Sequence, residues 1–329
     1  MSHTRRTPKP PRAGKTGRRT APSSGPQFAV APGGGIPGME KVHRVLGKLL
    51  ASQNFESPEA ANAYLRELVE SGGLNRLAEA EPADPKEEAQ DLAYRAMEAA
   101  TAKQARELTE QALKLDPDCV DALIIRAQAQ PLARKEYIAR LRLAVEAGER
   151  SLGSDFIRDN SGHFWGMIET RPLMRAKHGL GMALVDAGQN QEAISQLEEM
   201  LELNPNDNQG VRDILLGLYL LDGDLTGADR LLGQYRDDCG ATFVWGRVLR
   251  DLIAGNLRGA ASAIKKAMRS NPHVAEVLAG REGFPKALPG FYSPGSEDEA
   301  AYCLLWLGRA WMKHPEAIAW VAGSTAGLK

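Results

Sequence analysis

Three segments of this 329-residue chain end in the same way, and this recurrence is the feature that most constrains its fold. In each segment, an apolar run with three- and four-residue spacing is followed by Asp-Pro or Asn-Pro, a combination that favours the end of a helix. The gap between the second and third prolines is 67 residues, nearly two units of 34, and the first gap is 88 residues, two units plus 20. The segments are "ALKLDPDC" (112–119, with Pro117), "MLELNPND" (200–207, with Pro205) and "AMRSNPHV" (267–274, with Pro272).

Small residues mark the turns of the same units. Glycines occur at gaps of 35 and 32 residues, and an alanine follows each glycine five residues later. Glycine permits a tight turn and alanine lets two helices approach closely. These positions are Gly188, Gly223 and Gly255, followed by Ala193, Ala228 and Ala260.

A helix–turn–helix period of 34 residues with these landmarks is the tetratricopeptide pattern. The sequence therefore predicts an all-α fold, a tetratricopeptide-like solenoid, with units at 86–119, 120–173, 174–208, 209–240 and 241–273. An unrelated helical bundle remains the alternative.

Composition and start signals divide the chain further. The predicted parts are a Pro/Gly-rich basic tail (1–38), an N-terminal helical pair (39–83), the repeats (84–273, with an insertion near 151–170) and a C-terminal capping loop and helices (274–329). Ser57, Asp84 and Ser296 each stand at a predicted helix start, where their side chains can cap the first turn. An open solenoid exposes an apolar end, so terminal capping helices are expected.

The tail carries a charge opposite to that of the rest of the chain. Seven basic residues precede the first acid, Glu40, so the remainder holds 34 basic against 42 acidic residues. The basic residues are Arg5, Arg6, Lys9, Arg12, Lys15, Arg18 and Arg19. A segment of this composition is expected to be disordered. Three roles stay open: a solubilising tail, a transit peptide, and an arm that binds nucleic acid or another anionic partner.

No motif indicates catalysis or a cofactor. The sequence lacks a Walker phosphate loop, a GxSxG elbow, HExxH and CxxC spacing, so no catalytic residue, metal ligand or cofactor is predicted. The three cysteines, Cys119, Cys239 and Cys303, are widely spaced, which favours a reducing compartment and a cytoplasmic location. No apolar run is long enough to span a bilayer, and the basic N-terminal residues are not followed by an apolar stretch, so a secretory signal is not expected.

We therefore expect a binding module whose concave groove is lined by the first helix of each unit. The predicted groove positions are Gln90, Tyr94, Arg175, His178, Asp213 and Trp245. Arg175, His178 and Trp245 favour a peptide that carries one acid and one apolar anchor. Gln90 and Tyr94 replace the Lys and Asn of a chaperone-tail clamp, so binding of a chaperone carboxylate is not predicted.

The insertion supplies a second candidate surface. Trp165, Glu169 and Arg171 lie in or beside it, and Trp and Arg are typical interface anchors. The alternative is that Phe164 and Trp165 fill the gap that the insertion makes, with Glu169 paired to an arginine. A self-assembling structural solenoid is a further possibility.

Four stretches resemble bacterial tetratricopeptide proteins related to the suppressor of tumorigenicity protein 7 family: "LKLDPDCVDALIIRAQ" (113–128), "ETRPLMRAKHGLGMAL" (169–184), "LNPNDNQGVRDILL" (203–216), and "NPHVAEVLAG" with "SEDEAAYCLLWLGRAW" (271–280, 296–311). The similarity spans about residues 90–322. It implies an α-helical repeat scaffold and supplies no catalytic residues. Animal members are membrane-associated, a property not expected here.

Overall fold

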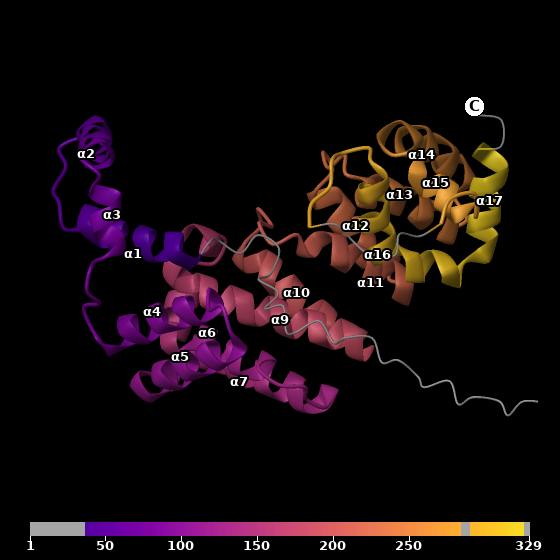
Figure 1. The fold of residues 1–329 in the computed structure, drawn as a ribbon. Coiled ribbons are helices and arrows are strands. Elements are labelled where there is room, and N and C mark those ends of the chain that lie inside the picture. Colours follow the sequence, from indigo (N-terminus) through magenta and orange to yellow (C-terminus); the bar gives the residue numbers. More distant parts are fainter. Residues whose placement is uncertain (1–36, 284–289, 326–329) are drawn as a thin grey trace, which may run out of the picture.

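The computed structural model describes residues 37–283 and 290–325, which form seventeen α-helices and two short 3-10 helices and contain no strand (Figure 1). The all-α prediction is confirmed for these residues. Most of the predicted tail, residues 1–36, lies outside them, and its last two residues, Pro37 and Gly38, begin the first helix.

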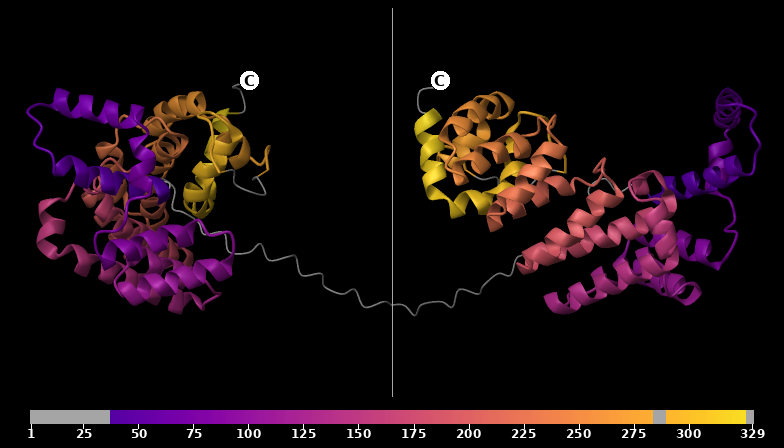
Figure 2. Two further views of the ribbon diagram at one scale, coloured as in Figure 1. Left: turned by 60° about the vertical axis from the view of Figure 1, so that its left-hand side comes forward. Right: turned by 180° about the vertical axis from the view of Figure 1, so that it is seen from behind.

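The N-terminal helices form the end of the molecule at which α2 and α3 stand apart from the rest (Figures 1 and 2). Three helices occur where a pair was predicted. These three are α1 (Pro37–Ala51), α2 (Pro58–Glu70) and α3 (Gly73–Ala78). Two pairs of helices follow: α4 (Pro85–Met97) with α5 (Ala102–Leu115), and α6 (Val120–Gln128) with α7 (Arg134–Leu152).

The remaining helices follow the insertion. They are α8 (Ser154–Asp159), η1 (Phe164–Gly166), η2 (Ile168–Thr170), α9 (Arg171–Ala187), α10 (Asn190–Leu203), α11 (Val211–Asp222), α12 (Leu225–Gln234), α13 (Ala241–Ile253), α14 (Leu257–Ser270), α15 (His273–Leu278), α16 (Glu297–Lys313) and α17 (Pro315–Thr325).

Local signals in the sequence account for the helix ends. Ser57, Asp84 and Ser296 each accept a backbone N–H of the first helical turn, as predicted. The turn glycines Gly188 and Gly223 have φ values of +72° and +78°, in the left-handed region that a β-carbon disfavours. The prolines expected to end helices follow α5, α10 and α14 within two residues.

The alanines five residues after the turn glycines are fully buried. Consecutive helices α4/α5, α9/α10 and α13/α14 pack against each other as hairpins, and α6/α7 and α11/α12 do the same. The hairpins fall within the residue ranges of the predicted units, and each of these alanines lies buried in the second helix of its unit. The inserted residues fold into α8, η1 and η2, with Gly162 N donating to Leu203 O at the end of α10 (3.1 Å).

The C-terminal helix α16 packs across α11 and α13, the first helices of two successive hairpins. The contact is close, since a β-carbon on Gly217 would lie 2.4 Å from the Trp306 carbonyl oxygen. Glu299 anchors the start of α16: Oε1 accepts Ala241 N (3.1 Å) and Oε2 accepts Asn271 Nδ2 (2.9 Å). A carboxylate is favoured there because it lies at the N-terminus of α13. The C-terminal segment thus packs on helices of two successive hairpins and not only on the last one.

Two groups of buried side chains form the core. A large one runs from α6 to α17, and a smaller one joins α4, α5 and α6. Helix α2 buries no residue. Among the described residues, we find no helix with the length and apolar character needed to cross a membrane.

Candidate functional site

The predicted site residues separate into two cavities and the core. Tyr94, Glu169 and Arg171 line one cavity, and Arg175, His178 and Asp213 line the other. The two cavities lie on either side of a buried network of charged side chains. The other two candidates, Trp165 and Trp245, line neither cavity.

The buried network is centred on Arg175 of α9, whose guanidinium bridges two carboxylates. Its Nε and Nη2 donate to Asp121 of α6 (2.8 and 2.6 Å), and its Nη1 donates to both oxygens of Glu40 of α1 (2.9 and 3.0 Å). Tyr94 OH donates to Glu40 (3.1 Å) and Gln90 Nε2 to Asp121 (2.7 Å). The network therefore ties α1, α4, α6 and α9 together.

Burial makes this pairing obligatory. Glu40 and Asp121 are 1% and 0% exposed, and a buried carboxylate without a partner costs several kcal/mol, of order ~3–5. Burial opposes the charge of Arg175, but Asp121 and Glu40 outweigh it, and the pKa of Arg175 is raised. Burial and the same two carboxylates raise the pKa of Tyr94. Because both of its carboxylate partners lie inside the protein, Arg175 is not free to hold an acidic group of a ligand.

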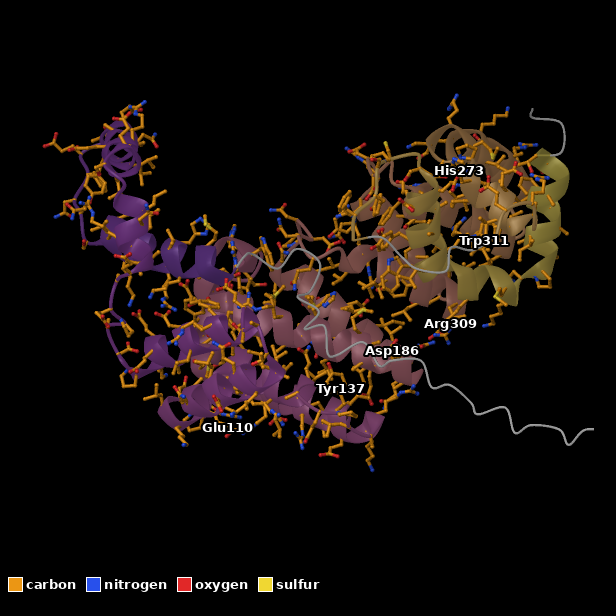
Figure 3. All side chains as sticks on the ribbon, viewed as in Figure 1. Glu110, Tyr137, Asp186, His273, Arg309 and Trp311 are labelled. Carbon is orange, nitrogen blue, oxygen red and sulfur yellow. The ribbon has the colours of Figure 1, made fainter. Side chains whose placement is uncertain are left out.

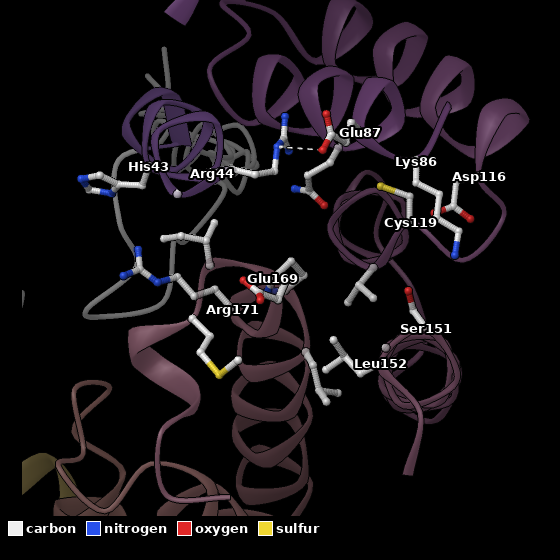
Figure 4. A pocket seen from close by; sticks show the side chains of 18 of the residues that line it. His43, Arg44, Lys86, Glu87, Asp116, Cys119, Ser151, Leu152, Glu169 and Arg171 are labelled. Carbon is white, nitrogen blue, oxygen red and sulfur yellow. Dashed lines mark ion pairs between the residues drawn. The ribbon is translucent and has the colours of Figure 1, made fainter. Parts of the chain in front are cut away.

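The first cavity has a volume of about 930 Å³ and lies between α1, α4, α7 and α9 (Figure 4). Its walls carry charges of both signs, many of them already paired. Arg44 and Lys48 of α1 contact Glu87 of α4, and Arg171 donates to Glu40 (3.3 Å). This internal pairing leaves the cavity with mixed charge and no clear preference for a ligand.

The second cavity has a volume of about 480 Å³ and lies between α6, α9, α11 and α16. Such a volume lies within the range of small-ligand and side-chain pockets. Aromatic and aliphatic side chains form most of its wall, and three carboxylates add polar points. The residues that matter below are Tyr137, Met182, Ile214, Tyr292, Tyr302 and Trp306, with Asp121, Asp186 and Asp213.

The second cavity continues along α9 and α16 into an adjoining hollow of about 390 Å³. Met182, Asp186, Ile214 and Trp306 line both, and Arg309 lines the second. Figure 3 shows Tyr137 on α7, and Asp186 toward the end of α9 that faces Arg309 of α16. We call the two hollows together the α9/α16 groove.

Asp213 is the least satisfied charge in this groove. Burial, assisted by Asp238, Asp207 and Glu299, raises its pKa to about 7, although Arg212 acts in the opposite direction. Within the described residues, we find no hydrogen bond or ion pair to its carboxylate. Gln209, also in the wall, has a buried Oε1 with no hydrogen-bond partner among these residues, while its Nε2 donates to Met174 O (3.3 Å). The wall thus offers acceptors that a donor-bearing ligand could satisfy.

His178 carries no charge at neutral pH, because burial lowers its pKa to about 4. The sequence predicted a groove that holds an acidic anchor through Arg175 and His178. The structure removes the basis of that prediction, since one cation is internally paired and the other side chain is neutral.

Trp245 was expected to face the groove, and this placement is wrong. Its side chain is 0% exposed, packs edge-to-face on Trp311 (6.4 Å between centroids), and donates from Nε1 to Asn271 O (3.0 Å). The physical reason is that α16 covers α13, a contact the repeat pattern does not contain.

The insertion residues are used internally as well. Phe164 is fully buried and Trp165 is half-buried against the core. The Arg171 guanidinium lies 5.0 Å from the centre of the Trp165 ring and pairs with Glu40, not with Glu169. Glu169 is exposed at the rim of the first cavity.

Sequence reasoning missed the aromatic wall of the groove. Tyr302 and Trp306 are four residues apart and share one face of α16, and Tyr292 packs on Tyr302 with ring centroids 5.1 Å apart. The spacing on α16 was visible in the sequence, but nothing there showed that this face meets α9 and α11.

No group of three His, Cys, Asp or Glu side chains in the described part of the chain could hold a metal ion. No protein-family model matches the chain, and no curated protein matches it.

Proposed function

We propose that this chain is a non-catalytic interaction scaffold, a tetratricopeptide-like solenoid that binds a peptide segment of a protein partner in the α9/α16 groove. The resemblance to relatives of the suppressor of tumorigenicity protein 7 family and the cytoplasmic location stay predictions. The alternative, association of the basic tail with nucleic acid or another anion, also stays a prediction, because residues 1–36 lie outside the described part.

The repeat assignment is supported by agreement between independent local features. The five hairpins match the predicted units, and each turn glycine adopts a positive φ. The alanines Ala193, Ala228 and Ala260 are each 0% exposed. Turn glycines and buried alanines at this period are the landmarks of a tetratricopeptide unit, and they support the proposed assignment.

One observation carries the binding assignment: an open groove between α9, α11 and α16 has apolar and aromatic walls, and the carboxylate of Asp213 in it has no hydrogen bond or ion pair among the described residues. Tyr and Trp side chains give a large contact area at low entropic cost, and they dominate the energetics of peptide recognition. Here four aromatic side chains from α7, α16 and the segment before α16 converge on one site. A core of the same residues would bury them, but Tyr292 is 44% exposed.

The test is selection of binders from a displayed library of twelve-residue peptides on the full chain. We then measure the affinity of selected peptides for M182E, which places a charged side chain in both hollows, and for D213N, which removes a charge at constant shape. Both variants should weaken the peptides at least ~10-fold, about 1.4 kcal/mol.

The matched control is E110Q, which removes one exposed carboxylate from α5, away from the groove (Figure 3). Its affinities should stay within about twofold of wild type. Peptides that bind M182E, D213N and E110Q equally well would place the binding surface elsewhere and overturn the assignment. Failure to select any peptide would have the same consequence.

A further inference from the structure

The basic N-terminal segment has no role in the function proposed above, yet its chemistry matches the groove. Residues 5–19 contain seven cationic side chains and no acid, with Pro8, Pro10 and Pro11 among them. Proline-rich segments populate the extended polyproline II form and dock on aromatic walls at low entropic cost.

The groove complements this segment in charge. Its two hollows together hold Asp121, Asp186 and Asp213 against two arginines, Arg175 and Arg309, and Arg175 is also bound to Glu40. A Lys or Arg side chain entering there would supply the missing partner of Asp213. It could also donate to the buried Oε1 of Gln209, and its aliphatic part would contact the aromatic rings.

The first described residues contact the C-terminal end of α4, which contributes one residue to this hollow. Gly38 N donates to Glu98 Oε1 (3.2 Å), and Met97, the neighbour of Glu98, lines the hollow. Two residues further on, Glu40 contacts Arg175 in its wall. Helix α1 then runs away from this point, and its later residues line the other cavity.

Chain length allows the segment to reach the groove. Arg19 and Arg5 precede Pro37 by 18 and 32 residues. A flexible linker of that length spans roughly 25–34 Å on average, which corresponds to an effective concentration near millimolar. Contacts that are too weak to hold a free peptide in the groove would therefore be sufficient to hold a segment of the same chain there.

We propose that residues 5–19 dock in the α9/α16 groove of their own chain, with a basic side chain at Asp213, and so compete with external ligands. This proposal rests on the proposed function, since it assigns an internal ligand to the same site. An external peptide must then displace the segment. When the effective concentration of the segment is well above the Kd of the segment for the groove, the apparent affinity of the external peptide falls by the ratio of that concentration to that Kd.

The first experiment is zero-length carbodiimide crosslinking of the dilute full chain, with the products mapped by mass spectrometry. Lys9 and Lys15 are the lysines of the segment, so their crosslinks report its position. We expect monomeric products that join them to Asp213 or Asp186. D213N should lose the first product, and E110Q should change neither.

The second experiment compares two full chains, wild type and a variant with all seven basic residues of the segment changed to Gln. The probe is a fluorescein-labelled peptide of residues 1–20, followed by anisotropy. The substitutions lie outside the described residues, and circular dichroism checks that the helical content is unchanged. The Gln variant should bind the probe at least 10-fold more tightly than wild type.

Each result decides one of the two proposals. If the probe binds both chains equally and D213N weakens that binding, the groove is a peptide site but the segment does not occupy it, and this inference is overturned. No binding to either chain would also overturn this inference, while the peptide library tests the groove independently. Crosslinks from Lys9 and Lys15 to acidic residues on all faces, together with probe binding that only added salt weakens, would also overturn this inference. They would indicate that the segment is an arm available to an anionic partner.

Discussion

At the scale of single residues, Asp213 shows how position in the fold changes the properties of a side chain. It lies in the first turn of α11 beside Arg212, and both the helix N-terminus and that arginine favour an ionised carboxylate. Burial in the groove wall, assisted by Asp238 and Asp207, outweighs them and raises its pKa to about 7. Groups held in an unfavourable charge state are characteristic of binding sites.

The Asp213 pKa predicts a pH-dependent stability. The folded chain holds this proton up to about pH 7, whereas an unfolded Asp releases it near pH 3.9, so the contribution of Asp213 to stability falls as pH rises from about 4 to 7. In the chain whose seven basic residues at 5–19 are changed to Gln, no cation of the segment can pair with Asp213. In that background, D213N should raise the free energy of unfolding at pH 8 by about 1–3 kcal/mol and should raise it less at pH 5. Urea unfolding at the two pH values measures the difference. An equal effect of D213N at both would refute the assignment, and E110Q should show no such dependence.

At the scale of elements, the packing of α16 on α11 depends on one glycine. A β-carbon on Gly217 would overlap the backbone carbonyl of Trp306, an atom that cannot move without shifting the helix. Trp306 also lines both hollows of the groove, so this contact sets the width of the groove.

We expect G217A to destabilise the fold by about 1–3 kcal/mol, the usual cost of overpacking, despite the higher helix propensity of alanine. The matched control is G308A on α16. There the nearest atom to a new β-carbon is 4.0 Å away, so the variant should be neutral or more stable by up to ~1 kcal/mol. Urea unfolding of both variants tests this contact, and equal stabilities would mean that α16 does not press on α11.

At the scale of the whole molecule, burial is uneven along the chain. The large core joins helices from α6 to α17, while α2 buries no residue and α3 buries only Gly73. An isolated helix of thirteen residues is marginal in water, so α2 has little to stabilise it.

Native-state hydrogen exchange should therefore show a gradient. Amides of α2 should exchange through local opening, with protection at least ~10³-fold lower than amides of α11, which should open only with the core. Mass spectrometry of peptides covering α2 and α11 measures both in one sample. Comparable protection in the two helices would show that α2 packs on something beyond the contacts described.

The sequence by itself determined many of the helix ends, although it predicted a pair of helices where α1, α2 and α3 occur. Ser57, Asp84 and Ser296 cap helices, and glycines such as Gly188 reverse the chain, because capping and positive φ depend on a few consecutive residues. Burial of the repeat alanines, such as Ala193, follows from the same period, since the two helices of a hairpin are neighbours in sequence.

The tertiary structure alone decided the charge and shape of the groove. Arg175 is neutralised by Glu40, which lies 135 residues earlier, and Trp245 is buried because α16 returns to cover α13. A repeat period records which neighbours pack together, but it contains no information on partners this far apart in sequence. The groove therefore became acidic and aromatic through contacts that no local pattern encodes.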